Sequence, residues 1–272
     1  MSEQERWQLA GSAPEIYERY LVPAIFAPWA SLLIEQAALN PGDRVLDVAC
    51  GTGVVARLAA QQVGGKGEVI GLDLNRGMLD VARSLASVQG GTIEWREGDV
   101  GSLPSAEASF DVAFCQLGLQ YFPDRGQAAR EMHRVLKAGG RLVALVWRAL
   151  AHSPGFAALA AALARHVSPE AKAVMEAPFV FGDDVEELRA LFRQAGFHSA
   201  RIRFDVRMVR FDSPDAFVQY QVAGSPLANH VAEVSEAVRQ ALLQEVSAAM
   251  AAYIDDAGLA FPIEAHIIIA EK

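Results

Sequence analysis

Two carboxylates and two glycines near the start of the chain have the types and spacing of a nucleotide-binding corner. Asp47 lies in an apolar run rich in β-branched residues, and Gly51 and Gly53 follow shortly after it. A strand, a glycine turn and a helix in this order let backbone amides approach a ligand that a Cβ atom would exclude. Asp73 ends a second apolar run, where an acid accepts hydrogen bonds from ribose hydroxyls. The pattern therefore predicts a ligand that contains adenosine.

Two such ligands fit the corner, and Asp47 distinguishes them. Residues 51–56 match the dinucleotide fingerprint G-x-G-x-x-G/A, which favours an NAD-dependent oxidoreductase. A carboxylate at the end of the strand, however, repels a pyrophosphate and attracts an ammonium group. S-adenosylmethionine carries an amino group and a sulfonium cation but no phosphate, so Asp47 favours that ligand over NAD.

Residues 44–56 resemble the first motif of class I S-adenosylmethionine-dependent methyltransferases, whose usual form is close to V-L-D-x-x-C-G-T-G. Residues 98–104 are similar to the G-D-x-x-x-L-P segment of the same family, and four such motifs follow in order along one alternation of strands and helices. The resemblance covers residues 13–147 strongly and the closing strands less so. The closest pattern is that of small-molecule methyltransferases of the ubiquinone/menaquinone-biosynthesis type.

The resemblance implies a set of cofactor-binding residues. It places an acid on the ribose, apolar side chains beside the adenine ring, and an acid and the next backbone amide at the adenine edge. A polar residue after the fourth strand meets the methionine moiety, and an N-terminal aromatic residue closes over the cofactor. Ordinary helix packing is the alternative for the apolar and aromatic members. The predicted set is Asp47, Ala49, Gly51, Gly53, Asp73, Leu74, Met78, Asp99, Val100, Gln116 and Tyr17.

The expected chemistry is direct in-line transfer of a methyl group to oxygen or carbon of a small molecule. The sulfonium carries its own leaving group, so the protein needs no metal and has only to position the methyl acceptor and exclude water. A general base helps where the methyl acceptor is protonated at neutral pH, as a phenol with a pKa of about 10 is. The candidate bases are His152, Tyr121 and His230, and a solvated loop residue is the alternative for His152.

The alternation of strands and helices predicts an α/β, Rossmann-like doubly wound fold. Residues 201–208 alternate polar and apolar, as a half-exposed edge strand does, whereas 262–270 are apolar on both faces. These two segments match the seven-stranded, mostly parallel sheet that the resemblance implies, with order 3-2-1-4-5-7-6 and strand 7 antiparallel. We expect one domain over 1–272, with a helical cover at 1–40 and helical lid insertions at 149–182 and 212–260. Four Ser-Pro pairs predict helix starts near 154, 169, 214 and 226.

The composition of the chain narrows the classes of partner and the compartment that we expect for this protein. A net charge of −9 over 272 residues disfavours a protein that tracks nucleic-acid phosphates. Cys50 and Cys115 are the only cysteines and have no metal spacing, which indicates a reducing compartment. No signal-peptide pattern or membrane-length apolar run occurs, so we expect a soluble, cytoplasmic protein with no nucleic-acid or membrane partner. The sequence leaves open the oligomeric state and a non-catalytic protein that binds S-adenosylmethionine.

Overall fold

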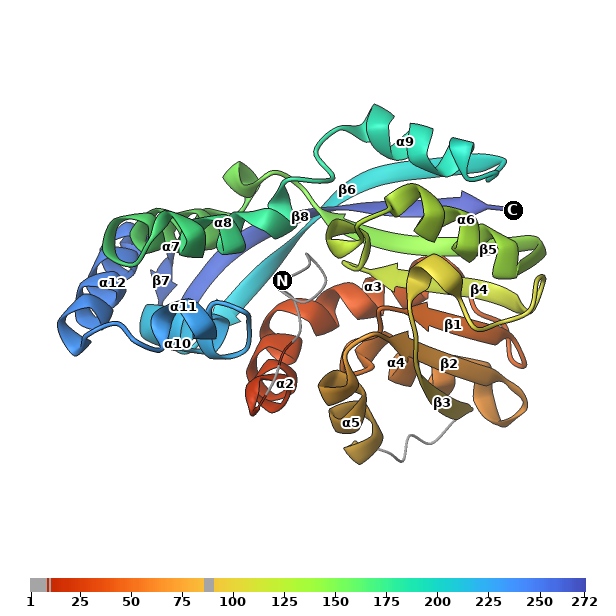
Figure 1. The fold of residues 1–272 in the computed structure, drawn as a ribbon, viewed down its shortest axis with the longest axis horizontal. Coiled ribbons are helices and arrows are strands. Elements are labelled where there is room, and N and C mark those ends of the chain that lie inside the picture. The colour runs from red at the N-terminus through yellow and green to blue at the C-terminus, as the bar shows by residue number, and fades with distance from the viewer. Residues whose placement is uncertain (1–8, 10, 86–90) are drawn as a thin grey trace.

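One mixed sheet runs through the whole molecule (Figure 1). The structure is a computed structural model, and it describes residues 9, 11–85 and 91–272. The strand order is β3-β2-β1-β4-β5-β8-β6, and a short β7 pairs with β8. The strands are β1 (Arg44–Val48), β2 (Glu68–Asp73), β3 (Thr92–Glu97), β4 (Phe110–Gln116), β5 (Leu136–Trp147), β6 (Ser199–Phe211), β7 (Ile254–Asp255) and β8 (Gly258–Glu271).

The predicted α/β fold and the order of the main strands are confirmed. Strands β1 to β5 pair in parallel, and β8 is antiparallel to both β5 and β6, as predicted for the seventh strand. The sequence analysis missed β7, because a strand of two residues leaves no periodic pattern. It also began the last strand at Pro262, whereas β8 begins at Gly258, opposite the end of β6.

Burial of apolar side chains explains the central strands. Val45, Leu46 and Val48 of β1 have no exposed surface, and neither do Ile267 and Ile268 of β8. Such runs fit strands that are covered on both faces. One face packs against α3 and α4, and the other against α6 and α9. These helices are α3 (Ala27–Ala37), α4 (Val54–Val63), α6 (Arg125–Val135) and α9 (Val185–Gln194); α5 (Arg76–Ser84) contacts β2 and β3.

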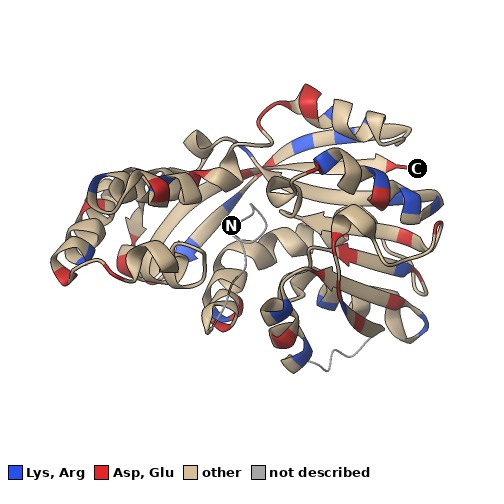
Figure 2. Cartoon of the chain, in the orientation of Figure 1, with Lys and Arg blue, Asp and Glu red and all other residues tan. Residues whose placement is uncertain are grey.

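The edge position of β6 is also confirmed. Phe204, Val206 and Met208 are exposed on one side of this strand, and Arg201 and Arg203 are exposed on the other. Figure 2 shows basic bands along β6 and a mixture of acidic and basic residues over the outer helices. Charged side chains along an edge strand oppose pairing with a further strand.

The second half of β6 and the first half of β8 extend away from the rest of the sheet and carry a layer of helices (Figure 1). Phe156, Phe217 and Phe261 pack edge to face there, with ring centroids 5.1 to 5.8 Å apart. We call five of these helices the lid helices because they lie in the predicted insertions; their action as a lid stays a prediction. They are α7 (Pro154–His166), α8 (Pro169–Glu176), α10 (Pro214–Ala223), α11 (Ala228–Val231) and α12 (Glu236–Ala249), and the short turn η6 (Ala177–Phe179) follows α8.

Three of the four Ser-Pro pairs stand at the start of a helix, and in two of them the serine side chain caps it. Ser168 and Ser213 cap their helices, because each hydroxyl accepts a hydrogen bond of 3.1 Å from the backbone N–H three residues on. Ser153 precedes α7 without a side-chain cap. The fourth pair deviates, since α11 begins at Ala228, two residues after Pro226.

The N-terminal cover is a continuous helical segment of α2 (Ala13–Ile16), a π-helix η1 (Tyr17–Phe26) and α3. This segment contains two prolines: Pro23 lies inside η1, and Pro28 lies in the first turn of α3. Residues 1–8 and 10 of the predicted cover lie outside the described residues. Nowhere in the described ranges is there a helix both long and apolar enough to span a membrane.

Candidate functional site

The glycine turn after β1 has the backbone that its sequence requires. Ala49, Gly51 and Gly53 all have positive φ, with values of 55°, 55° and 86°. The two glycines serve different purposes. A Cβ at Gly51 would make only an ordinary contact, 3.9 Å from the Tyr17 hydroxyl, so the positive φ is what favours glycine there. A Cβ at Gly53, in contrast, would overlap the ring of Trp95 on β3. Gly53 therefore provides for packing between the turn and the sheet.

Asp73 ties the end of β2 to this turn. Its carboxylate accepts a hydrogen bond of 2.7 Å from the Gly51 N–H and another of 2.8 Å from the Asn75 N–H. Burial raises the pKa of Asp73 above its usual value, and the two N–H groups oppose that shift. The carboxylate thus stands at the carboxyl ends of β1 and β2, the edge of a doubly wound sheet where ligands bind.

Asp47 is buried beneath the turn. It is 1% exposed, and its carboxylate accepts a hydrogen bond of 3.0 Å from the Ala56 N–H near the start of α4. Burial raises the pKa of Asp47 to about 8, and the nearby Asp73 contributes in the same direction. The acid that distinguished the two ligands in the sequence is therefore buried beneath the turn rather than exposed to a ligand.

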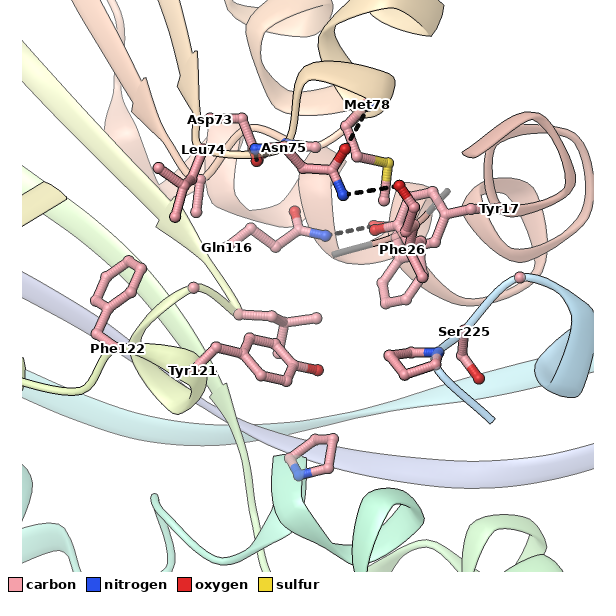
Figure 3. Close-up of a pocket in the computed structure, with 18 of the residues that line it drawn as sticks. Tyr17, Phe26, Asp73, Leu74, Asn75, Met78, Gln116, Tyr121, Phe122 and Ser225 are labelled. Atoms are coloured by element: carbon pink, nitrogen blue, oxygen red, sulfur yellow. Dashed lines mark hydrogen bonds between the residues drawn. The ribbon is translucent and has the colours of Figure 1, made fainter. Parts of the chain in front are cut away.

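A cavity of about 260 Å³ lies between the strand ends, η1 and the lid helices (Figure 3). Most of the predicted site residues line it, and four predicted residues, Asp47, Gly53, His152 and His230, are not among the lining residues. The roles of the lining residues stay predictions. Those that line the cavity are Tyr17, Ala49, Gly51, Asp73, Leu74, Met78, Asp99, Val100, Gln116 and Tyr121.

Hydrogen bonds fix the polar side chains at the strand ends. Asn75 caps α5 by accepting from the Met78 N–H at 3.2 Å, and Asp99 accepts from the Gly101 N–H at 2.8 Å. The Gln116 side chain donates through Nε2 to the Phe26 carbonyl at 3.0 Å, as Figure 3 shows. Its Oε1 atom is buried with no hydrogen-bond partner among the described residues.

Comparison with known proteins agrees with this geometry. Residues 45–140 match a family described as a methyltransferase domain. The chain is 42% identical over 121 residues to a 2-phytyl-1,4-naphtoquinone methyltransferase of Synechococcus elongatus, which is 43% of this chain and 51% of that protein. It is 39% identical over 119 residues to the ubiquinone/menaquinone biosynthesis C-methyltransferase UbiE of Xanthomonas campestris, which is 43% of this chain and 47% of that protein. The chain thus spans about half the length of these curated relatives.

Residues 45–140 belong to the class I S-adenosylmethionine-dependent methyltransferases. The likeness of fold extends beyond this methyltransferase domain. The crystal structure of YcgJ from Bacillus subtilis matches with a TM-score of 0.58 at 22% identity and covers 89% of this chain and 97% of its own. At that identity the match concerns the fold alone.

The charges around the cavity fit S-adenosylmethionine, the cofactor of this family. Asp73 and Asp99 line the cavity, and no Lys, Arg or His does so among the described residues. Acids without bases suit a ligand with an ammonium and a sulfonium group, whereas a pyrophosphate would have no cation to meet. The charges of the lining therefore favour a cationic ligand such as S-adenosylmethionine over an anionic one.

His152 lies in a different environment from the one predicted. Its Nδ1 is 3.5 Å from the carboxylate of Glu264 on β8, and its Nε2 is 4.0 Å from that of Asp183. Arg148 forms ion pairs with the same two acids. The side chain thus belongs to a group of charged residues outside the cavity lining, because β8 supplies a carboxylate close to the end of β5. His230, the other histidine named from the sequence, lies on α11 and is also absent from the lining.

Several lining residues were not predicted from the sequence. Phe26, stacked on Tyr17 with ring centroids 4.8 Å apart, lies at the end of the π-helix. Others come from α8, η6 and α10 and the turn after it, where the Ser-Pro pairs predicted helix starts but not which side chains face the cavity. The unpredicted residues of the lid side are Val174, Met175, Pro178, Gln221, Gly224, Ser225, Pro226 and Leu227.

Proposed function

We propose that this protein transfers a methyl group from S-adenosylmethionine to a small aromatic methyl acceptor of the quinol type. The observation that carries the proposal is a cavity that joins Asp73 and Asp99, at the strand ends, to Met175 and Leu227 of the lid side. A cofactor in the first part of this cavity and a methyl acceptor in the second would be in contact. The relatives that act on naphthoquinone and on ubiquinone or menaquinone precursors support the quinol class.

S-adenosylmethionine, when bound, supplies a methyl group on a positively charged sulfur that is itself the leaving group. The chain positions the partners and excludes water. The stacked rings of Tyr17 and Phe26 close one side of the cavity. Burial raises the pKa of both Tyr17 and Tyr121, so their hydroxyls stay protonated at neutral pH and do not act as bases.

The methyl acceptor provides the nucleophile. A carbon or oxygen atom forms a bond to the methyl carbon while the carbon–sulfur bond breaks, and the electron pair of that bond remains on sulfur. The methyl acceptor then releases one proton to water. We propose carbon as the nucleophilic atom, and the relatives named C-methyltransferases support this choice.

The test is turnover of methyl-labelled S-adenosylmethionine with naphthalene-1,4-diol under reducing conditions, followed by mass spectrometry. We expect a product that carries one labelled methyl group on a ring carbon, together with an equal amount of S-adenosylhomocysteine. Calorimetric titration with S-adenosylmethionine and with NAD runs alongside. Binding of NAD in place of S-adenosylmethionine would refute the proposal, and binding of S-adenosylmethionine without turnover of any reduced naphthoquinone or benzoquinone would leave a non-catalytic binding protein.

A further inference from the structure

The helix η1, which forms one wall of the cavity, has an unusual winding. Its backbone hydrogen bonds span five residues instead of four, as the bond from the Ala27 N–H to the Val22 carbonyl shows. It is 10 residues long, whereas π-helices are rare, usually last a single turn and are frequently found at functional sites. The cause of this winding lies in Pro23, and its consequence is the shape of the cavity wall.

The winding decides which side chains of η1 face the cavity. Tyr17, Leu21 and Phe26 line it, at spacings of four and five residues. Tyr17 and Phe26 are nine residues apart, which is about two and a half turns of an α-helix and would place them on opposite sides. A π-helix turns about every 4.4 residues, so the same nine residues make about two full turns. The π form therefore explains why the two rings stack, with centroids 4.8 Å apart.

Pro23 explains why this segment is not an α-helix. A proline inside an α-helix removes one backbone hydrogen bond, and its ring clashes with the carbonyl four residues earlier, which here belongs to Arg19. A helix whose bonds span five residues does not aim that carbonyl at the proline, so the ring is accommodated. Pro23 therefore disfavours the α form of the segment relative to the π form.

The end of η1 next to α3 is the fixed end. Trp29 of α3 has no exposed surface, and the Phe26 carbonyl accepts the hydrogen bond of 3.0 Å from Gln116. A change of winding would therefore be taken up at Tyr17, at the other end of η1. The Tyr17 hydroxyl lies at the glycine turn, 3.9 Å from where a Cβ on Gly51 would be.

Two neighbours of Tyr17 attach the same end of η1 to other helices. Glu18 accepts a hydrogen bond of 2.8 Å from Arg57 of α4, the helix that begins at the glycine turn. Tyr20 stacks on Tyr220 of α10, with ring centroids 3.8 Å apart. Each of these side chains needs its own direction around η1, so the winding also fixes how the N-terminal cover meets the lid helices.

We propose that Pro23 is a positioning residue for the cofactor: it keeps η1 in the π form, which holds the Tyr17 ring against Phe26 and beside the glycine turn. This inference rests on the proposed function, because it takes S-adenosylmethionine as the ligand at that turn. Pro23 is exposed and is not among the described residues that line the cavity, so it acts through Tyr17.

The test is the affinity for S-adenosylhomocysteine, measured by calorimetry for the parent, Pro23→Ala, Tyr17→Leu and the double variant. We expect each single variant to bind about tenfold more weakly than the parent. Because Pro23 acts through Tyr17, Pro23→Ala should change the affinity less than about twofold when residue 17 is already leucine. Pro28→Ala is the matched control and should leave the affinity unchanged, since a proline in the first turn of an α-helix is compatible with α winding.

Two further measurements separate positioning from a structural role. Alanine favours a helix more than proline does, and Pro23 is exposed, so the thermal midpoint of ligand-free Pro23→Ala should not fall. In the parent, S-adenosylhomocysteine should slow hydrogen exchange of the η1 amides about tenfold or more, because the bound ligand holds the π form. This second measurement requires no variant.

Each contrary outcome has one meaning. The proposal would be overturned if Pro23→Ala or Tyr17→Leu bound S-adenosylhomocysteine as tightly as the parent, or if Pro23→Ala caused the same loss in both backgrounds. A lowered midpoint with unchanged affinity would assign Pro23 to the fold alone. Unchanged exchange of the η1 amides on binding would overturn the proposal even where Pro23→Ala does not fold. Failure of the parent to bind S-adenosylhomocysteine would instead refute the proposed function, so the parent is titrated first.

Discussion

Replacing Asp47 with asparagine should stabilise the ligand-free protein. The folded state holds this carboxyl protonated up to a pKa of about 8, against an ordinary pKa of 3.8 in an unfolded chain. Between these two values the folded state binds one proton more than the unfolded state, so Asp47 makes the free energy of unfolding fall by about 1.4 kcal/mol per pH unit. At pH 7 the free energy of unfolding has therefore fallen by a total on the order of 4 kcal/mol.

The Asp47→Asn variant would escape this loss because an amide does not titrate, while the amide oxygen can still accept from the Ala56 N–H. We expect the variant to unfold at higher urea concentration than the parent at pH 7 and with little difference at pH 4. The assay is urea unfolding at pH 4, 5, 6, 7 and 8, with the slope against urea concentration compared between the two proteins. The difference between the two free energies of unfolding should grow steadily with pH over this window.

Cofactor binding should favour the ionised form of Asp47, whereas the ligand-free protein favours the protonated form. A cation bound beside Asp73 favours the ionised form of Asp47, so S-adenosylmethionine should bind Asp47→Asn more weakly by about 1–3 kcal/mol. Calorimetry in buffers with different ionisation enthalpies should record proton release on binding for the parent at pH 7 and none from this site for the variant. A parent and a variant with the same pH dependence of unfolding would refute the reasoning, since the buried carboxyl would then titrate normally.

Three further substitutions test other parts of the structure. Gly53→Ala places a Cβ against the ring of Trp95 at a positive φ and should reduce the free energy of unfolding by about 3 kcal/mol in urea, whereas Gly65→Ala, where a Cβ meets no atom within 4 Å, should change it little. Tyr220→Leu removes the stack that holds α10 and should raise KM for naphthalene-1,4-diol several-fold with the affinity for S-adenosylhomocysteine unchanged; equal loss of both would contradict a lid role. His152→Ala should leave turnover within about threefold because His152 is outside the cavity lining, and a loss of about 100-fold or more would restore it as the base.

The part of the cavity at the strand ends was predictable because its residues follow buried strands directly. Asp73 and Gln116 are the last residues of β2 and β4, and Asp99 comes two residues after β3. Parallel strands bring their carboxyl ends to one edge, so an apolar run followed by a polar residue places that residue in space without knowledge of distant contacts. The two glycines also predicted the turn, because glycine favours the positive φ that the chain adopts where it reverses toward the helix.

Distant strand pairings explain the surroundings of Gly53 and His152 that the sequence did not predict. The requirement for glycine at position 53 comes from Trp95, which β3 brings beneath the turn through two intervening strand pairings. His152 follows β5 at the expected place, yet its side chain meets Glu264, because β8 lies antiparallel beside β5. A single-sequence pattern gives the strands but not which side chains of two neighbouring strands face one another.

The lid side of the cavity could not be predicted for a related reason. Met175, Gln221 and Leu227 reach the cavity from insertions whose position depends on the long pairing of β6 with β8 and on the stack between η1 and α10. None of these contacts involves the strand ends that hold the cofactor residues. Substitutions on α8 and α10 should therefore alter the choice of methyl acceptor while the affinity for S-adenosylmethionine stays the same.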